Sequence, residues 1–329
     1  MDAIASLLDG PRARGAFLLR VELDPPWSMR IADEAPLTLV AITRGEAVVA
    51  SGSEPPRPLR HGDVLIARGV PYTISDAPAT PVQVIVAPGP RCLSPDGQWL
   101  DQPFDPTAPG WHTATHGYVG VRTWGNTRSG AAQLLVGTYP MRSAVGDRLT
   151  SALPTLAVLP GFGRQSSLFT LLSEEITSDA PGQDVVLDRL LDLLLVAALR
   201  GWFSRPDANP PRWYQAGADP VIGPVLRMLL DDPARDWTVA SLAAAARLSR
   251  AAFARRFTEL VGQPPIAFLV GWRLAMAADL LSDTDATLDA IARSVGYSSP
   301  FALSTAFKRF HGISPQEHRR ASAAAPVPG

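Results

Sequence analysis

The sequence predicts an N-terminal all-β barrel followed by two helices, and a C-terminal all-α domain. Two observations predict this fold class. Up to about residue 163 the chain consists of short apolar runs separated by Gly and Pro, a pattern typical of a β-sandwich or β-barrel. Beyond that point the apolar residues recur at helical spacing. The length of 329 residues is sufficient for two such domains.

The expected strands lie between residues 14 and 161. Turn residues separate them, and a tight turn is expected at Gly62 and Asp63. The strand-length runs are AFLLRVEL, LTLVAIT, EAVVAS, DVLIAR, PVQVIVAP and AQLLVGTYP.

Two helices are expected next, over SSLFTLLSEEI and DVVLDRLLDLLLVAALRGWF. The second helix carries a wide apolar stripe. Such a stripe either packs against its own domain or forms a helix-pair dimer interface, and the sequence leaves both alternatives open. The stripe consists of Leu187, Leu190, Leu191, Leu194, Leu195 and Ala198.

Pro-rich, polar residues 204–215 mark a domain boundary. The chain from residue 219 onward is helical by pattern, with Pro and Gly at its turns. We therefore divide the chain into a barrel (1–163), a helix pair expected to dimerise (164–205), a linker (206–218), a helical domain (219–320) and a disordered tail (321–329).

Composition excludes several classes of protein. The net charge of −1 gives no bulk argument for a polyanionic partner, so such a partner must be argued from local clusters of charge. The single cysteine, Cys92, excludes an intramolecular disulfide and a cysteine-rich zinc site. The N-terminus lacks the features of a signal peptide, and the longest apolar run, Leu190–Leu199, is too short to span a bilayer. These observations predict a cytoplasmic protein with no membrane partner.

The helical domain contains an internal repeat. LAAAARLSRAAFARRFTELVGQPPIAF begins at Leu242, and IARSVGYSSPFALSTAFKRFHGISPQEH begins at Ile291. Phe253 in the first copy matches Leu303 in the second, and Phe257 likewise matches Phe307. Each copy reads as a helix, a sharp turn and a second helix, so the repetition indicates two copies of one helix-turn-helix unit.

The second helix of each copy has a predictable outward face. Its apolar pair, spaced four residues apart, is buried on one side, and Ser249 or Ser299 is placed to cap its N-terminus. Positions two residues away lie about 200° around the helix, so Ala251, Arg255 and Thr305 point outward. This is the face that a helix-turn-helix unit inserts into the major groove of DNA.

Each outward side chain suits a different contact with DNA. The fork of Arg255 can bond guanine at two atoms, while small side chains such as Thr305 can touch thymine methyl groups. Basic residues beside them are candidates for phosphate contacts. The candidate DNA-binding residues are Ser249, Arg250, Ala251, Ala252, Arg255, Arg256, Ser298, Ser299, Ala302, Thr305, Lys308 and Arg309.

The repeated segments identify a family. The stretch from WTVASLAAAARLSRAAF through IARSVGYSSPFALSTAFKRFHGISPQEHRR closely resembles the DNA-binding domain of AraC/XylS transcription regulators, over about Asp219–Arg320. The resemblance implies two helix-turn-helix units joined by a long helix at about Pro265–Ser282, both facing double-stranded promoter DNA. Arg247 stands where the family commonly has Gly, and His318 where Tyr is usual. The second recognition helix projects no Arg or Gln, so we expect the first unit to supply most of the hydrogen-bonded readout.

The N-terminal part resembles the cupin-type sensor domain found ahead of such DNA-binding domains, through FLLRVELDPPWSMRI, RHGDVLIARGVPYTI and LLVGTYPM. Tyr72 falls where metal-binding cupins place a His, so the resemblance implies no metal site, and we expect no cofactor. His112 and His116 have a spacing that metal ligands can use, but no acidic partner is near, and loop histidines are the expectation.

Four residues of the N-terminal part are candidates for effector binding. They are Trp27, Arg30, Tyr72 and Cys92. The first three can line a pocket inside the barrel, although packing is their ordinary role. Arg91 precedes Cys92 and can raise the reactivity of its thiol, although an inert buried thiol is the default.

The leading hypothesis is a sequence-specific, homodimeric DNA-binding transcription regulator that responds to a small-molecule effector or chemical signal through its cupin-like domain. Activation is the commoner mode in the family, and RNA polymerase is a further candidate partner. The alternative is a cupin-type enzyme, an isomerase or dioxygenase, fused to a DNA-binding domain, but no catalytic constellation supports it, and we expect no enzyme. A third hypothesis is a constitutive DNA-binding protein whose barrel only dimerises.

Overall fold

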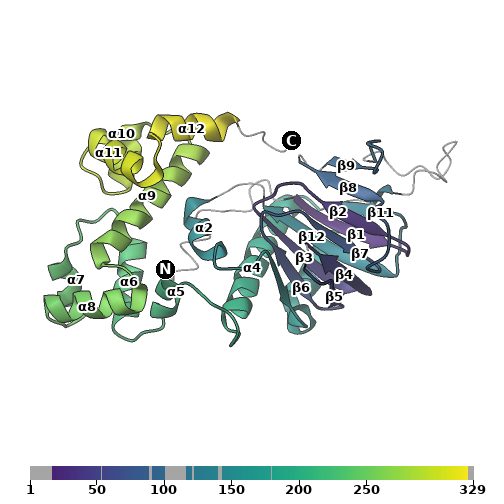
Figure 1. Ribbon diagram of the computed structural model, residues 1–329, viewed down its shortest axis with the longest axis horizontal. Helices are drawn as coiled ribbons and strands as arrows, with labels where there is room; N and C mark the ends of the chain where they lie inside the picture. Colours follow the sequence, from purple (N-terminus) through teal and green to yellow (C-terminus); the bar gives the residue numbers. More distant parts are fainter. Residues whose placement is uncertain are drawn as a thin grey trace. The chain divides into compact units, whose positions relative to one another are not determined.

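The computed structural model describes residues 17–52, 54–88, 91–100, 116–120, 122–139, 143–178 and 180–324. The chain divides into two compact units. One, the β unit, contains the strands and the helix pair. The other, the helical unit, contains residues 209–324 together with a short segment around residues 143–152. The fold class predicted from the sequence is confirmed (Figure 1).

The larger sheet of the β unit is antiparallel except where β1 and β11 run parallel. Its strands, in spatial order, are β10 (Gly117–Gly120), β11 (Thr123–Gly125), β1 (Phe17–Leu23), β12 (Ala132–Tyr139), β3 (Leu37–Arg44), β6 (Val64–Ala67) and β13 (Leu156–Leu159).

The smaller sheet is antiparallel except for the pair β2 and β8. Its strands, in spatial order, are β5 (Arg57–Arg60), β4 (Glu46–Ala50), β7 (Tyr72–Ser75), β2 (Ser28–Ile31), β8 (Val84–Ala87) and β9 (Arg91–Leu93). The expected turn at Gly62 is present, with Gly62 in the left-handed region at φ 87°.

The core of the β unit draws apolar side chains from both sheets into one cluster. Val21 and Val40 enter it from the larger sheet, and Met29 and Ile74 from the smaller one. Trp27, which is fully buried, lies in the same cluster. The inward residues of the two sheets therefore form one shared apolar interior.

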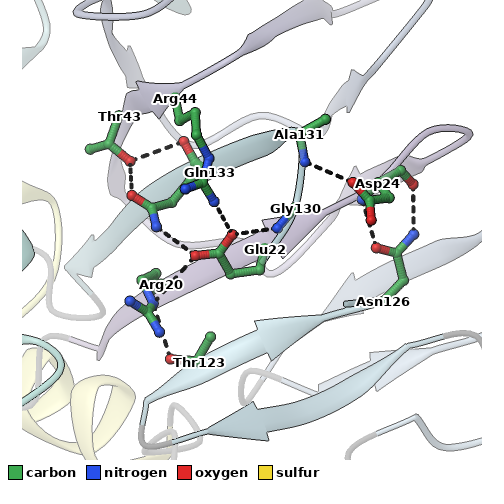
Figure 2. A network of polar contacts seen from close by, with 10 residues as sticks. All are labelled: Arg20, Glu22, Asp24, Thr43, Arg44, Thr123, Asn126, Gly130, Ala131 and Gln133. Atoms are coloured by element: carbon green, nitrogen blue, oxygen red, sulfur yellow. Dashed lines mark hydrogen bonds and ion pairs between the residues drawn. The ribbon is translucent and has the colours of Figure 1, made fainter. Parts of the chain in front are cut away.

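A buried carboxylate joins three strands of the larger sheet (Figure 2). Glu22 on β1 is only 2% exposed and accepts hydrogen bonds from Arg44 Nη2 at 2.6 Å, from the Gly130 backbone N–H at 2.9 Å and from Gln133 Nε2. Arg20 adds a second guanidinium at 3.7 Å. Because both oxygens have donors, the buried charge is compensated, and the network fixes the register of β1, β3 and β12.

The helices of the β unit show how the apolar stripe of residues 187–198 packs. They are η1 (Phe162–Gln165), α3 (Ser167–Glu175) and α4 (Gln183–Phe203). Leu191 of the stripe is buried, its carbonyl accepts from Tyr139 Oη at 2.9 Å, and it occupies the space beside Gly137 on β12. Leu187, Leu194 and Leu195 are also buried, so the stripe packs within its own domain rather than forming a dimer interface.

The helical unit extends beyond the predicted boundaries. Its elements are α2 (Ala144–Thr150), α5 (Arg212–Ala216), α6 (Ile222–Asp231), α7 (Val239–Ala245), α8 (Arg250–Val261), α9 (Pro265–Asp283), α10 (Leu288–Ser294), α11 (Pro300–His311) and α12 (Pro315–Ala324).

Two boundaries differ from those expected. Part of the predicted linker forms α5, because Trp213 is buried with its ring centroid 5.9 Å from that of Trp272. Residues 321–324, expected in a disordered tail, are the end of α12, and residues 325–329 lie outside the described part. Helix α9 is long and apolar enough to cross a membrane by composition, but 56% of that stretch is buried inside the protein, as in a core helix.

The most unexpected element is α2, which the sequence assigned to the barrel. It lies between β12 and β13 in the chain but packs on α9. Asp279 of α9 accepts from Ser143 Oγ at 2.9 Å and from the backbone N–H groups of Ala144 and Val145 at 2.6 and 3.2 Å. The Asp279 carboxylate thus caps the N-terminus of α2, where a negative charge is favourable.

A stacked guanidinium provides a second contact between α2 and α9. Arg148 lies 5.4 Å from the ring centroids of both Phe268 and Trp272. A Cβ on Gly271 would come within 3.1 Å of Arg148 Nη1, so the glycine leaves room for the guanidinium on the helix surface. Burial lowers the pKa of Arg148 from its ordinary value, which agrees with an enclosed position.

Candidate nucleic-acid interface

The first helix-turn-helix unit is built on an aromatic core. Phe253 and Phe257 of α8 are fully buried, with ring centroids 5.6 Å apart. The ring of Phe257 meets that of Phe268 on α9 at 6.1 Å, and Phe268 stacks on Trp272 at 6.2 Å. The spacing of four residues therefore buries one face of α8, as predicted.

The second unit repeats this arrangement with smaller side chains. Leu303 and Phe307 of α11 are fully buried and belong to one cluster with Ile291 and Val295, next to α10. Leu281 on the C-terminal half of α9 joins the same cluster. Helix α9 thus contributes one half to each unit, as the predicted connecting helix should.

The turns of the two units have the same backbone geometry. In the first, the N–H of Leu248 bonds to the carbonyl of Ala243 at 3.0 Å; in the second, the N–H of Tyr297 bonds to that of Ala292 at 2.8 Å. This pattern is a Schellman motif, which requires a left-handed residue before the donor. That residue is Gly296 at φ 79° in the second turn, but Arg247 at φ 54° in the first. Arg247, which stands where the family commonly has Gly, therefore has a strained backbone conformation.

The predicted N-caps are confirmed. Ser249 Oγ accepts from the N–H of Ala252, and Ser299 Oγ accepts from the N–H of Ala302, both at 3.2 Å. These two serines were also candidates for contact with DNA. Their oxygen atoms are engaged in capping, which leaves each hydroxyl hydrogen as a donor toward a phosphate.

The outward faces of α8 and α11 are exposed as the helical rotation predicts. Ala251 and Arg255 are exposed on α8, and Thr305 is exposed on α11. Ala252 and Ala302 are partly exposed beside them. The remaining exposed candidates are Ser249, Arg250, Arg256, Ser298, Lys308 and Arg309.

Two arginines of α8 have acidic neighbours. Arg255 is 77% exposed and only loosely paired with Glu259, at 3.8 Å. Arg256 instead donates to Asp219 at 2.9 Å, and Asp219 also accepts from the N–H of Ile222 at the start of α6. Arg256 therefore connects α8 to α6, whereas the fork of Arg255 projects into solvent, where it can meet a base edge.

One arginine of the helical unit, Arg273, has a structural role. Arg273 of α9 donates to the carbonyls of Pro233, Arg235 and Gly296, at 2.7, 2.8 and 3.1 Å. It holds the turn of the second unit against the loop between α6 and α7. His318, which replaces the usual Tyr, packs its ring 5.4 Å from that of Phe307.

Sequence reasoning missed Phe301. This residue follows the first residue of α11, and its side chain is 82% exposed, on the outward side of the helix. The repeat provides the signal that would have found it, because Phe301 stands 50 residues after Ala251, at the offset that relates Phe307 to Phe257.

The structure brings three of the four effector candidates into one cluster. Trp27, Tyr72 and Cys92 are all buried in the core of the β unit. The strand register β7-β2-β8-β9 places Tyr72 and Cys92 in one cross-strand row, through Ile31 and Val86. Their side chains therefore belong to the same face of the smaller sheet.

The side chain of Arg30 is exposed, because neighbouring residues of β2 alternate between faces, so Arg30 does not join the buried cluster. Arg91 likewise points away from Cys92: it donates to the Pro88 carbonyl at 2.9 Å and lies over the ring of Trp99. The expected effect of Arg91 on the thiol therefore has no support from the geometry.

Burial shifts the pKa of two side chains in the β unit. Desolvation, with a further contribution from Asp33, raises the pKa of the Tyr72 phenol, which stays neutral. Desolvation lowers the pKa of His116 to about 4, and its ring stacks on Trp124 at 5.3 Å. His112 lies outside the described residues. Within the described ranges, no three His, Cys, Asp or Glu residues gather as a metal site would require.

Comparison with known proteins agrees with this architecture. A family model described as "Cupin" matches residues 2–204, and one described as "Helix-turn-helix domain" matches residues 242–321. A putative AraC-like transcription regulator of Streptomyces lividans is 36% identical over 191 residues, which are 57% of this chain and 63% of the relative. The activator RclR of Escherichia coli K12, named as RCS-specific, is 31% identical over 56% of this chain and 67% of its own length.

The chain belongs to the AraC-like transcription regulators with an N-terminal cupin domain. The regulator AlkR of Acinetobacter baylyi is also similar, at 33% identity over 54% of this chain. This AraC-like chain matches just under two thirds of the length of the first two relatives, 63% of each. The DNA-binding domain of AdpA, solved with a target DNA, is 36% identical over 32% of this chain and 96% of its own, with a TM-score of 0.31.

Proposed function

We propose that this AraC-like chain is a sequence-specific DNA-binding transcription regulator that acts in the cytoplasm. Its cupin domain senses a small molecule or chemical signal and has no enzymatic role. The observation that carries the proposal is the pair of recognition helices, α8 and α11, which bury equivalent faces and expose equivalent faces. The names of the relatives, all of them regulators, support the same conclusion.

Buried polar atoms support an effector site inside the β unit. Within its described residues, Trp27 Nε1, Ser28 Oγ and Trp124 Nε1 are buried and make no hydrogen bond to the protein. A buried donor without an acceptor costs about 1–3 kcal/mol. An effector that offers acceptor atoms near Trp27 would remove this cost, and Tyr72 and Cys92 belong to the same cluster.

Helix α2 supports a route from effector to DNA. It follows β12 in the chain but is bonded to α9, which contributes to the core of both helix-turn-helix units. A change in the strands that flank α2 would therefore alter the restraint on α9. In this proposal the effector biases DNA binding by shifting the docking equilibrium of α2.

Exposed apolar side chains support a homodimer formed by the helix pair, although not by the stripe first considered. Val185, Val186 and Leu193 are 63%, 43% and 52% exposed and fall within about 100° of the circumference of α4. Leu171 on α3 is 49% exposed. Native mass spectrometry of the full chain tests this part of the proposal, since a monomeric mass would contradict it.

Selection of DNA sites from a random pool with the purified full-length protein tests DNA binding. We expect an enriched site with two boxes about one helical turn apart. Arg255→Ala should then cost about 1–3 kcal/mol in affinity and relax preference at one base pair. Arg227→Ala, an exposed arginine on α6, removes the same charge away from the recognition helices and is the control. No enriched site, or equal affinity for the Arg255→Ala variant and the wild type, would contradict the proposal.

A further inference from the structure

Phe301 has the most exposed of the large apolar side chains in the described part of the chain, at 82%. Leaving such a ring in water forgoes the free energy that its burial would supply. The ring lies in the first turn of α11, the recognition helix of the second unit. Single exposed apolar residues are common on protein surfaces, so it is the position of this ring on a recognition helix, more than its exposure, that points to an occupant outside the isolated chain.

The helical rotation places Phe301 on the outward face of α11. At 100° per residue, Thr305 lies about 40° from Phe301 and Lys308 about 20° on its other side. The buried pair, Leu303 and Phe307, lies about 200–240° away. Phe301, Thr305 and Lys308 therefore form one exposed stripe, which we call the α11 stripe.

The chemistry of the α11 stripe fits DNA. Lys308 and the adjacent Arg309 supply positive charge at one end, and α11 contains no acidic residue over Pro300–His311. Phosphates on either side of a groove are the natural counterions for such an end. In the first unit, the residues equivalent to Phe301 and Thr305 are Ala251 and Arg255, which are exposed in the same manner.

We propose that Phe301 is a specificity-determining residue that packs against the 5-methyl group of a thymine in the major groove. The inference rests on the proposed DNA-binding function. Thymine is the base that offers an apolar group in the major groove, and phenylalanine is among the side chains that contact it. The first two turns of α11 carry no Arg, Lys, Asn or Gln, so apolar contact is the readout that these turns can provide.

The test removes the methyl group and the ring separately. The full-length wild type and Phe301→Ala are titrated with the selected DNA site, in which each thymine is replaced in turn by deoxyuridine. Phe310→Ala is the matched control: Phe310 is 58% exposed on the same helix, but nine residues later it points to the opposite side. Thermal melting of all three proteins checks that each is folded.

At one thymine of the box that α11 contacts, we expect deoxyuridine to weaken wild-type binding about fourfold, which is the effect of losing one buried methyl group. The same replacement should not affect Phe301→Ala, and it should still affect Phe310→Ala fourfold. Equal losses in the wild type and Phe301→Ala at every thymine would overturn the inference and leave DNA binding intact. Unchanged affinity of Phe301→Ala would also overturn it and point to a protein as the occupant. If the wild type selects no site, the proposed function itself fails.

Discussion

The docking of α2 depends on one half-buried carboxylate, which makes Asp279→Asn an informative change. Desolvation raises the pKa of Asp279, while its three hydrogen bonds act in the opposite direction. The carboxylate thus depends on donors from the N-terminus of α2, namely Ser143 Oγ and the N–H groups of Ala144 and Val145. In the variant one oxygen becomes an NH2 group, so at least one of these donors faces another donor.

The magnitude follows from the number of bonds lost. A hydrogen bond to a charged group contributes about 1.5–3 kcal/mol, so the loss of one should raise the opening of α2 about 10- to 150-fold. Hydrogen–deuterium exchange of peptides that cover residues 143–152 measures this opening, because the N–H groups of Ala144 and Val145 are protected by the contact itself.

Asp283→Asn is the control for this experiment, since Asp283 lies one turn further along α9 and is exposed. We expect its exchange pattern over residues 143–152 to match that of the wild type. If Asp279→Asn also matches the wild type, the carboxylate does not hold α2, and the proposed route from effector to α9 loses its support.

Two further predictions concern stability. Arg247→Gly should stabilise the helical unit by about 1 kcal/mol, because it removes the backbone strain of a non-glycine residue at φ 54° and the side chain it deletes is exposed. Gly296→Ala should have the opposite effect, because its Cβ would lie 2.5 Å from the Ala234 carbonyl oxygen. Thermal melting of both variants checks this. Burial lowers the pKa of His116 to about 4, so between pH 4 and 6.5 the unfolded chain binds more protons than the folded one. The contribution of His116 to the free energy of unfolding of the β unit should therefore be fully present above pH 6.5 and fall by about 3 kcal/mol toward pH 4. Urea titrations of the wild type and His116→Phe across this range measure that contribution, and equal slopes for the two proteins would refute the prediction.

Local sequence patterns were sufficient for the helix-turn-helix units. The spacing of Phe253 and Phe257, the capping serines and the long helix after Pro265 all act within a few residues, so the pattern alone predicts them. The outward position of Arg255 followed from the same rotation. Phe301 was also predictable from this rotation, because it stands two residues before the buried Leu303 as Ala251 stands two residues before Phe253.

Contacts between distant residues could not be predicted in this way. The capping of α2 joins Ala144 to Asp279, which are 135 residues apart, and a seven-residue helix between two strands has no strong periodicity of its own. The pairing of Arg256 with Asp219 spans 37 residues and engages an apparent phosphate-binding residue within the helical unit, although its side chain stays exposed. In both cases the tertiary partner, not the local sequence, decides the role of the side chain.

In the proposed complex, the two units divide base recognition between complementary side chains. At the first of two equivalent outward positions, α8 has Ala251 and α11 has Phe301; at the second, α8 has Arg255 and α11 has Thr305. One helix therefore presents a long hydrogen-bonding fork beside a small residue, and the other a large apolar ring beside a small hydroxyl. A guanidinium favours guanine, and an apolar ring favours the thymine methyl group. If both helices bind as proposed, the operator should be asymmetric, with a guanine in the box read by α8 and a thymine in the box read by α11.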